Sequence, residues 1–376
     1  MNEQIIDLLR EIKTRDGSDL VLKANSRPLY RIYGDLIPID AYPDSLSADE
    51  VSHLIHSLLT PLQREIFERD LELDFSYELK DVSRFRVNVF QQQNSMGMVA
   101  RAIPFEIRTL ESIGTPEVCA DLCEAPRGLV LVTGPTGCGK SSTLAAMIQY
   151  INETRSEHII TIEDPIEFVY TDKKSLINQR ELGSDTHSFA EALRHVLRQD
   201  PDVILIGEMR DLETMALAIT AAETGHLVFG TLHTTDAVQT IDRIIDVFPT
   251  HQQQQIRVQL AVNLVGIVSQ VLVKRPDGKG RVAAFEMLVA TNAVRNLIRE
   301  SKTHQLPSII QTAANQGMID LDQGLAKLAA EGKADPDDAR SKSSHPTQFD
   351  QHLAYLQAKA SSAAAAAVRP DPIEGG

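Results

Sequence analysis

The chain has 376 residues, a length typical of two or three domains. Its residues are 43% hydrophobic and 24% charged, which is typical of a globular protein. Its formal net charge of −15 argues against a large basic surface, so nucleic acid is not an expected partner. Three cysteines in a chain of this length exclude a disulfide scaffold. The spacing of Cys119 and Cys123 favours two buried thiols on one helix face over a metal site.

The N-terminal segment is an amphipathic helix pattern with acidic residues. It lacks the basic start and apolar stretch of a secretory signal. No run of about 18 apolar residues occurs in the sequence, so no direct membrane insertion is expected. These features predict a cytoplasmic protein.

Residues 1–105 are predicted to form a small α+β domain. A helix is expected over Ile5–Lys13, and Ser47 with Glu50 fits a capping box at the start of a second helix. Strand patterns occur at Leu20–Lys23, Leu29–Tyr33, Leu36–Ile39, Arg84–Phe90 and Met96–Ile103, the last two as a pair. Residues 106–127 are expected to be a linker that carries a short helix.

The next segment, 128–290, alternates apolar strands with helices, which predicts an α/β fold with a mostly parallel sheet. Strands are expected at Gly128–Thr133, Ile159–Ile162, Val203–Ile206, Leu227–Thr231, Val271–Lys274 and Arg281–Val289. Helices are expected at Ser141–Asn152, Phe189–Arg198 and Thr214–Glu223, and the short helix of the preceding linker at Pro116–Leu122. Residues 291–358 are predicted to be a helical C-terminal region, and 359–376 a disordered, low-complexity tail.

A phosphate-binding loop is the strongest functional signal. The pattern G-x-x-x-x-G-K-[ST] lies between an apolar strand and a helix, as such a loop requires. Glycines let successive backbone N–H groups face phosphate oxygens, Lys140 would reach the β- and γ-phosphates, and Ser141 would supply a hydroxyl to Mg²⁺. The expected nucleotide-binding residues are Gly134, Pro135, Thr136, Gly137, Cys138, Gly139, Lys140, Ser141 and Ser142. The sequence therefore predicts binding and hydrolysis of ATP with Mg²⁺. Cys138 lies within the loop, so its oxidation or alkylation could block the nucleotide.

Two acids follow apolar strands, where open parallel sheets bind ligands. Glu208 comes after Gly207, which holds the position of the usual Walker B aspartate, and Glu163 directly follows the strand Ile159–Ile162. Glu208 is expected to position or deprotonate the attacking water, and Glu163 to polarise it, although the two roles could be exchanged. Both acids are candidate Mg²⁺ ligands, partly through water. His226 and His233 flank the next apolar strand and are candidates for sensing the γ-phosphate.

These motifs together resemble a known family. The stretches GPTGCGKS, TIEDPIE, ILIGEMRD and TAAETGHLVFGTLHT, with AVRNLIRE near residue 300, resemble the secretion ATPase superfamily, most closely the type IV pilus retraction (PilT-like) ATPases. The resemblance covers about residues 1–330. It implies a PAS-like N-terminal domain, a RecA-like second domain and a homo-hexamer with ATP between the two domains. It also implies arginine fingers, which map to Arg86 and Arg101; the alternative for Arg84 and Arg86 is a solvated strand position.

The resemblance implies a hexameric motor that drives pilus retraction, pilus disassembly and twitching motility. It places the protein in the cytoplasm at the inner-membrane base of the pilus machine. The implied partners are an inner-membrane platform protein and a paralogous retraction ATPase.

The chain also departs from the family pattern. The segment Gln92–Ser95 lacks an arginine found in many retraction ATPases, Cys138 replaces a serine or threonine, and Val294 replaces isoleucine. These departures keep an accessory (PilU-like) retraction ATPase open as an alternative. A pilus-assembly or secretion ATPase is disfavoured because the cysteines cannot form its tetracysteine zinc module. A nucleotide-binding partner with little turnover and a nucleic-acid-dependent ATPase are also disfavoured.

Overall fold

The computed structural model describes residues 2–15, 17–32, 35–80, 82–103 and 107–367. The chain divides into two compact units. The first comprises Met1–Glu106 with Glu167–Val169, and the second Ile107–Ile166 with Tyr170–Gly376. Residues from Ile107 onward, which we expected to form a linker, therefore group with the second unit.

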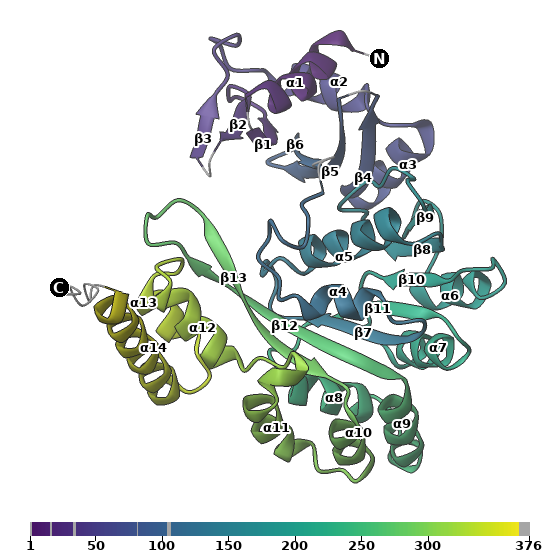
Figure 1. Cartoon of the computed structure of the whole chain (residues 1–376). Helices are drawn as coiled ribbons and strands as arrows, with labels where there is room; N and C mark the ends of the chain where they lie inside the picture. Colours follow the sequence, from purple (N-terminus) through teal and green to yellow (C-terminus); the bar gives the residue numbers. More distant parts are fainter. Residues whose placement is uncertain (1, 16, 33–34, 81, 104–106, 368–376) are drawn as a thin grey trace. The chain divides into compact units, whose positions relative to one another are not determined.

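The first unit is an antiparallel sheet with helices packed on one face (Figure 1). The strand order is β3-β2-β1-β6-β5-β4. Its elements are α1 (Glu3–Thr14), β1 (Gly17–Lys23), β2 (Leu29–Ile32), β3 (Asp35–Pro38), α2 (Ala48–His56), α3 (Pro61–Asp70), β4 (Glu72–Leu79), β5 (Ser83–Gln92) and β6 (Ser95–Ile103). The capping box of Ser47 and Glu50 is confirmed, as is the antiparallel pairing of β5 with β6. Apolar residues of α1 and α2 meet the buried side of the sheet, as α+β packing requires.

The second unit contains a seven-stranded sheet in the order β13-β12-β7-β11-β10-β8-β9, parallel except for β13. Its strands are β7 (Gly128–Thr133), β8 (His158–Glu163), β9 (Leu176–Glu181), β10 (Val203–Ile206), β11 (Leu227–Leu232), β12 (Leu264–Lys274) and β13 (Arg281–Val289). The helices of the sheet region are α4 (Val118–Cys123), α5 (Lys140–Thr154), α6 (Phe189–Val196), α7 (Leu212–Glu223), α8 (Ala237–Asp246) and α9 (Thr250–Asn263). The parallel α/β fold predicted from the alternating pattern is confirmed.

Helices cover both faces of this sheet, which explains why its central strands β7, β10 and β11 are buried along their whole length (Figure 1). Leu129 and Leu131 of β7 pack with α6 to α9, whereas Val130 and Val132 pack with α4 and α5. Cys119 and Cys123 of α4 are free and buried in the second of these cores, as their spacing predicted.

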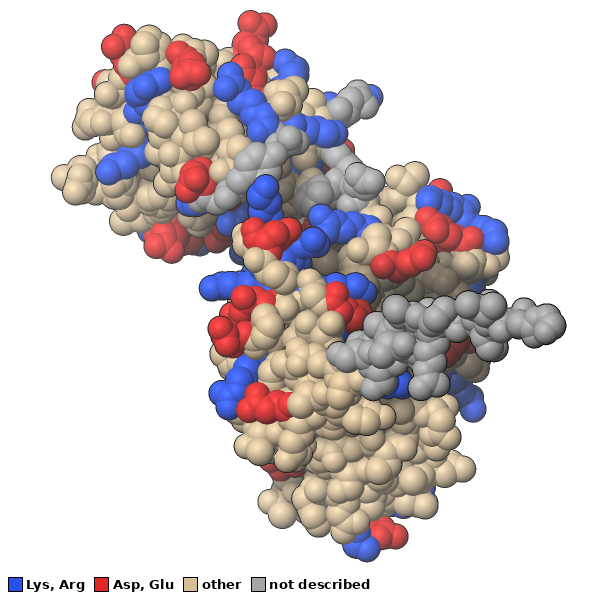
Figure 2. Space-filling model, turned by 60° about the vertical axis from the view of Figure 1, so that its left-hand side comes forward, with Lys and Arg blue, Asp and Glu red and all other residues tan. Residues whose placement is uncertain are grey.

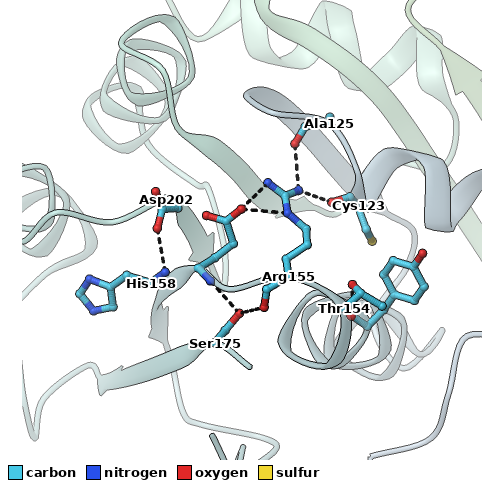
Figure 3. A network of polar contacts seen from close by, with 9 residues as sticks. Cys123, Ala125, Thr154, Arg155, His158, Ser175 and Asp202 are labelled. Carbon is cyan, nitrogen blue, oxygen red and sulfur yellow. Dashed lines mark hydrogen bonds and ion pairs between the residues drawn. The ribbon is translucent and has the colours of Figure 1, made fainter. Parts of the chain in front are cut away.

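A polar network fixes the C-terminal end of α5 (Figure 3). Arg155 donates to the carbonyl oxygens of Cys123 (2.5 Å) and Ala125 (3.1 Å), and its guanidinium pairs with Glu157 at 2.8 Å. The hydroxyl of Ser175 donates to Arg155 O at 2.8 Å. This network ties α5, the helix that follows the phosphate loop, to the end of α4.

The C-terminal region consists of α10 (Asn292–Arg299), α11 (Leu306–Thr312), α12 (Leu321–Ala330), α13 (Pro336–Lys342) and α14 (Pro346–Ala367). Helices α12 to α14 share a small core with Val273 and Ala284 of the β12–β13 hairpin. Within the part of the chain that the structure describes, no helix has the length and apolarity needed to cross a bilayer.

Three expectations about secondary structure differ from the structure. Strand β9, at the edge of the sheet, was not predicted because its Asn, Gln and Arg residues do not form an apolar strand pattern. Strand β12 begins at Leu264, before the expected Val271, because it follows α9 directly without a turn residue. The tail expected to be disordered from 359 continues α14 to Ala367, as strong alanine helix propensity allows, and residues 368–376 lie outside the described part.

Candidate nucleotide-binding site

The phosphate loop follows β7, which lies between β11 and β12 in the sheet. Gly134, Gly137 and Gly139 have φ values of 142°, 77° and 91°, which other residues rarely adopt. A Cβ on Gly134 would also stand 2.4 Å from the carbonyl oxygen of Gln270. The loop leads into the N-terminus of α5 at Lys140, where backbone N–H groups favour an anion. The local backbone therefore fits the phosphate-binding role.

Lys140 lies folded over this loop. Its Nζ donates to the carbonyl oxygens of Gly134 (2.7 Å) and Pro135 (3.2 Å). Ser141 and Ser142 lie in the first turn of α5, beside the lysine. An ammonium held by neutral carbonyls can exchange them for phosphate oxygens, which bind it more strongly.

Cys138 is 4% exposed, and its sulfur lies 2.7 Å from the point where a Cβ on Gly134 would stand. Burial raises the pKa of the Cys138 thiol. A buried thiol with a raised pKa reacts poorly, because the thiolate is the reactive form. We therefore expect oxidation or alkylation of Cys138 to be slow in the folded protein.

The carboxylate of Glu208 is held by two neighbours. His233 Nε2 lies 3.1 Å from Glu208 Oε1, and Arg210 Nε donates to the same oxygen. Burial alone would raise the pKa of Glu208. The hydrogen bond from Arg210 outweighs this effect, together with the positive charges of Arg210, His233 and Lys140, and the pKa lies below its ordinary value. His233 Nδ1 also lies 3.5 Å from Thr136 Oγ1 in the phosphate loop. The structure thus brings the loop, Glu208 and His233 together at the carboxyl edge of the sheet.

Glu163 ends β8, the strand beside β10. It is 9% exposed and accepts hydrogen bonds from Thr161 Oγ1 (2.6 Å) and Gln179 Nε2 (3.1 Å). These donors fix the orientation of its carboxylate. Glu163 is therefore the more enclosed of the two acids, and Glu208 the one linked to the loop through His233.

The position of Gly207 explains the unusual Walker B pattern. Its N–H donates to Ile162 O at 2.8 Å, and a Cβ on Gly207 would lie 3.1 Å from that oxygen and 3.2 Å from Glu163 Cα. A side chain there would press against the end of β8. The acid therefore follows one residue later, as Glu208.

His226 lies away from this group, which corrects the expectation that both histidines serve one site. His226 precedes β11 and His233 follows it, so the strand separates them by roughly 20 Å. His226 Nδ1 instead lies 2.9 Å from Ala221 O, at the edge opposite the phosphate loop. The two residues are close in sequence, but a parallel strand places its ends on opposite edges of the sheet.

Arg86 and Arg101 belong to the first unit and stand directly opposite each other on β5 and β6. Arg101 Nε lies 2.8 Å from Asp19 Oδ1, and the Asp19 carboxylate is 4% exposed. Arg86 pairs with Asp74 only at 4.0 Å, and about half of its side chain is exposed. Both guanidinium groups remain accessible to solvent. That exposure fits both the arginine-finger interpretation and the alternative of a solvated strand.

Sequence reasoning missed three residues that contact these groups. Gln179 lies on the unpredicted β9, and Gln270 on the part of β12 that precedes the expected strand Val271–Lys274. Arg210 stands two residues after Glu208 in a motif that was already recognised, so its charge was the available signal.

On the face in Figure 2, Lys and Arg are interspersed with Asp and Glu and form no continuous basic surface.

Comparisons with known proteins show the family of this chain. The family "Type II/IV secretion system protein" matches residues 81–339. The chain is 51% identical over 345 residues to the type IV pilus retraction ATPase PilT of Pseudomonas aeruginosa, covering 92% of this chain and 99% of that protein. It is 42% identical over 332 residues to the type IV pilus ATPase PilU of the same organism, covering 88% and 86%.

Among solved structures, the chain resembles the pilus retraction motor PilT with bound ADP. The TM-score is 0.87 at 46% identity, covering 92% of this chain and 99% of the other. The similarity extends over both units, and the phosphate loop stands at the carboxyl edge of the parallel sheet. The chain therefore belongs to the Type II/IV secretion system protein family and is a P-loop ATPase.

Proposed function

We propose that this protein is the ATP-driven motor of type IV pilus retraction, acting as a homo-hexamer. The proposal rests on the match to PilT over 99% of that protein's length, which includes both units of this chain. Retraction disassembles the pilus and produces twitching motility. The motor acts from the cytoplasm at the inner-membrane base of the machine, on a platform protein of that membrane.

The proposed catalytic residue is Glu208, which positions or deprotonates the attacking water. With a pKa below its ordinary value, Glu208 is ionised at neutral pH and can accept a proton. His233 holds Glu208 beside the phosphate loop, where it also senses the γ-phosphate. Glu163 polarises the water from the neighbouring strand. His226 has no proposed role at this site.

The remaining residues bind ATP and balance charge. Lys140 leaves its loop carbonyls for the β- and γ-phosphates, and the loop N–H groups hold the phosphate oxygens. Arg86 and Arg101 neutralise the charge that develops on the transferring phosphoryl group. Their exposed guanidinium groups are consistent with that role.

Magnesium fits the oxygen donors at this edge. A hydroxyl from Ser141 and carboxylates from Glu208 and Glu163 are the ligand types that Mg²⁺ prefers, with water and phosphate completing the shell. No cluster of three or more His, Cys, Asp or Glu side chains suited to a metal occurs among the described residues. When bound, Mg²⁺ supplies positive charge to the β- and γ-phosphates.

A PilU-like accessory ATPase that works with another retraction motor is the second candidate. The missing arginine at Gln92–Ser95 favours it, whereas the higher identity to PilT (51% against 42%) favours the main motor.

The first experiment combines Lys140→Ala with a deletion strain. We expect the variant to fold as the wild type does, to lose ATP hydrolysis and to fail to restore pilus retraction. Wild-type turnover by this variant would contradict the proposed site. If the deletion strain retracts its pili while a paralogue is present, the accessory candidate replaces the main motor. The mass of the purified protein in solution tests the hexamer.

A further inference from the structure

Gln270 of β12 lies directly beneath the phosphate loop. Strand β12 pairs in parallel with β7 as far as Ser269 opposite Thr133, so Gln270 is level with Gly134, the first loop residue. Gln270 is 1% exposed. Its own carbonyl oxygen is the atom that a Cβ on Gly134 would meet at 2.4 Å. The backbone of β12 and the loop are therefore in close contact.

The Gln270 side chain joins the loop to the helix that follows it. Its Nε2 donates to Cys138 O at 2.6 Å, and its Oε1 accepts from Thr143 Oγ1 at 2.8 Å. Because a carbonyl oxygen only accepts, the amide nitrogen must face Cys138, which fixes the orientation of the amide. The hydroxyl of Thr143, itself 2% exposed on α5, then donates to the other end.

This contact has a geometric consequence for phosphate binding. In a trans peptide, the C=O and the N–H point in opposite directions. Gln270 holds the carbonyl of Cys138 down toward the sheet, so the N–H of Gly139 in the same peptide is directed to the opposite side of the loop. Phosphate loops bind their ligand with such N–H groups.

We propose that Gln270 is a positioning residue for ATP, because it sets the orientation of the peptide between Cys138 and Gly139. Thr143 supports it by holding the amide in the required orientation. This inference rests on the proposed nucleotide site at Gly134–Ser141. It predicts a change in nucleotide affinity, whereas a purely structural role predicts only a loss of stability.

The test compares Gln270→Met, which keeps the length of the side chain but removes both hydrogen bonds, with Ser269→Ala. Ser269 is also buried on β12, but its hydroxyl meets Thr133 at 2.9 Å rather than the loop. We expect Gln270→Met to raise the Kd for ADP and the KM for ATP about tenfold, since a buried carbonyl loses its donor. The kcat should stay within about threefold, and Ser269→Ala should lower the Tm without nucleotide but keep the wild-type Kd.

A second pair of variants remains informative if Gln270→Met does not fold. Thr143→Val removes the hydroxyl donor and should raise the Kd for ADP several-fold, while Thr143→Ser keeps the hydroxyl and should restore affinity. A wild-type Kd in both Gln270→Met and Thr143→Val, with only the Tm reduced, would overturn the inference. Because these readouts are nucleotide affinities of the purified chain, they do not depend on whether the protein retracts pili.

Discussion

His233 Nε2 lies 3.1 Å from Glu208 Oε1, so a residue that follows β11 fixes a carboxylate that follows β10. We expect His233→Ala to lower kcat about 10- to 100-fold, because the carboxylate loses the group that holds it beside the loop. The Kd for ATP should change little. Steady-state ATPase assays measure the effect, with His251→Ala on the exposed surface of α9 as the control. An unchanged kcat would separate His233 from catalysis.

Arg210 lowers the pKa of Glu208 through a hydrogen bond and its charge, against the raising effect of burial. The ionised carboxylate is the form that accepts a proton, so turnover is retained above this pKa and falls as the pH drops through it. We expect Arg210→Gln to move the acid limb of kcat/KM to higher pH, and Arg210→Lys to move it less. A profile of kcat/KM from pH 4 to 8 checks this expectation. Identical acid limbs in all three proteins would argue against Glu208 as the base.

Gly207 lies against the end of β8, where a Cβ would be 3.1 Å from Ile162 O. We expect Gly207→Ala to destabilise the fold by about 1–2 kcal/mol, because the strands must separate slightly. Gly207→Asp, which restores the usual Walker B acid, should be less stable still and should not exceed wild-type turnover. Thermal unfolding of both variants measures the cost. A Gly207→Asp protein of wild-type stability would show that the site accepts a side chain.

Alanine variants of Arg86 and Arg101 should distinguish an effect on catalysis from an effect on stability. Arg86 makes only a long, exposed contact with Asp74, so Arg86→Ala should cost no more than about 1 kcal/mol of stability. Arg101→Ala removes the closest cation from the buried Asp19 and should lower the Tm. If both arginines serve the phosphoryl group, both variants lose kcat. Asp19→Asn should restore the Tm of Arg101→Ala but not its kcat; recovery of both would make Arg101 purely structural.

Glu286 lies in a cavity of about 280 Å³ lined by Asp236, Asp320, Asp322 and His345. Burial, followed by the three nearby carboxylates, raises the pKa of Glu286 to about 8, although the N–H of Ala237 lowers it. Between the ordinary value of 4.5 and about 8, the folded chain holds a proton that the unfolded chain releases. Stability should therefore fall as the pH rises through this window and level off above it.

Glu286→Gln should remove this part of the pH dependence, because the amide does not titrate. Denaturant unfolding between pH 5 and 9 measures it, and the exposed Glu117→Gln serves as the matched control. A parallel fall in the Glu286→Gln protein would assign the dependence to other groups.

The sequence predicted those parts of the fold whose signals are local. The apolar run Gly128–Thr133 became β7 without change, and the capping box at Ser47 formed as expected. Strand β9 escaped prediction because an edge strand can carry polar residues such as Gln179. The start of β12 escaped because a strand buried on both faces has no alternating pattern, and no turn residue separates it from α9.

The residues of the candidate site were likewise predicted only where their signals are local in the sequence. The phosphate loop and Glu208 follow from motifs, since their chemistry requires particular residue types at a fixed spacing. Gln270 could not be found in this way because it reaches the loop from a strand more than 130 residues later, through pairing that only the fold supplies. His226 and His233 looked equivalent in the sequence because a seven-residue spacing does not show which edge of the sheet each one reaches.

Strand β12 contacts the phosphate loop at Gln270 and the C-terminal helices at Lys274. The Lys274 N–H donates to Asp338 at 2.8 Å, and the Lys274 carbonyl accepts from the Asp335 N–H at 2.8 Å. The four-residue step between these two points is about 13 Å of extended backbone, which cannot lengthen further. A pull on helix α13 along this strand would therefore be transmitted toward Gln270 and the phosphate loop. A pull on the C-terminal helices and the loss of a phosphate group would act on opposite ends of one stiff connection.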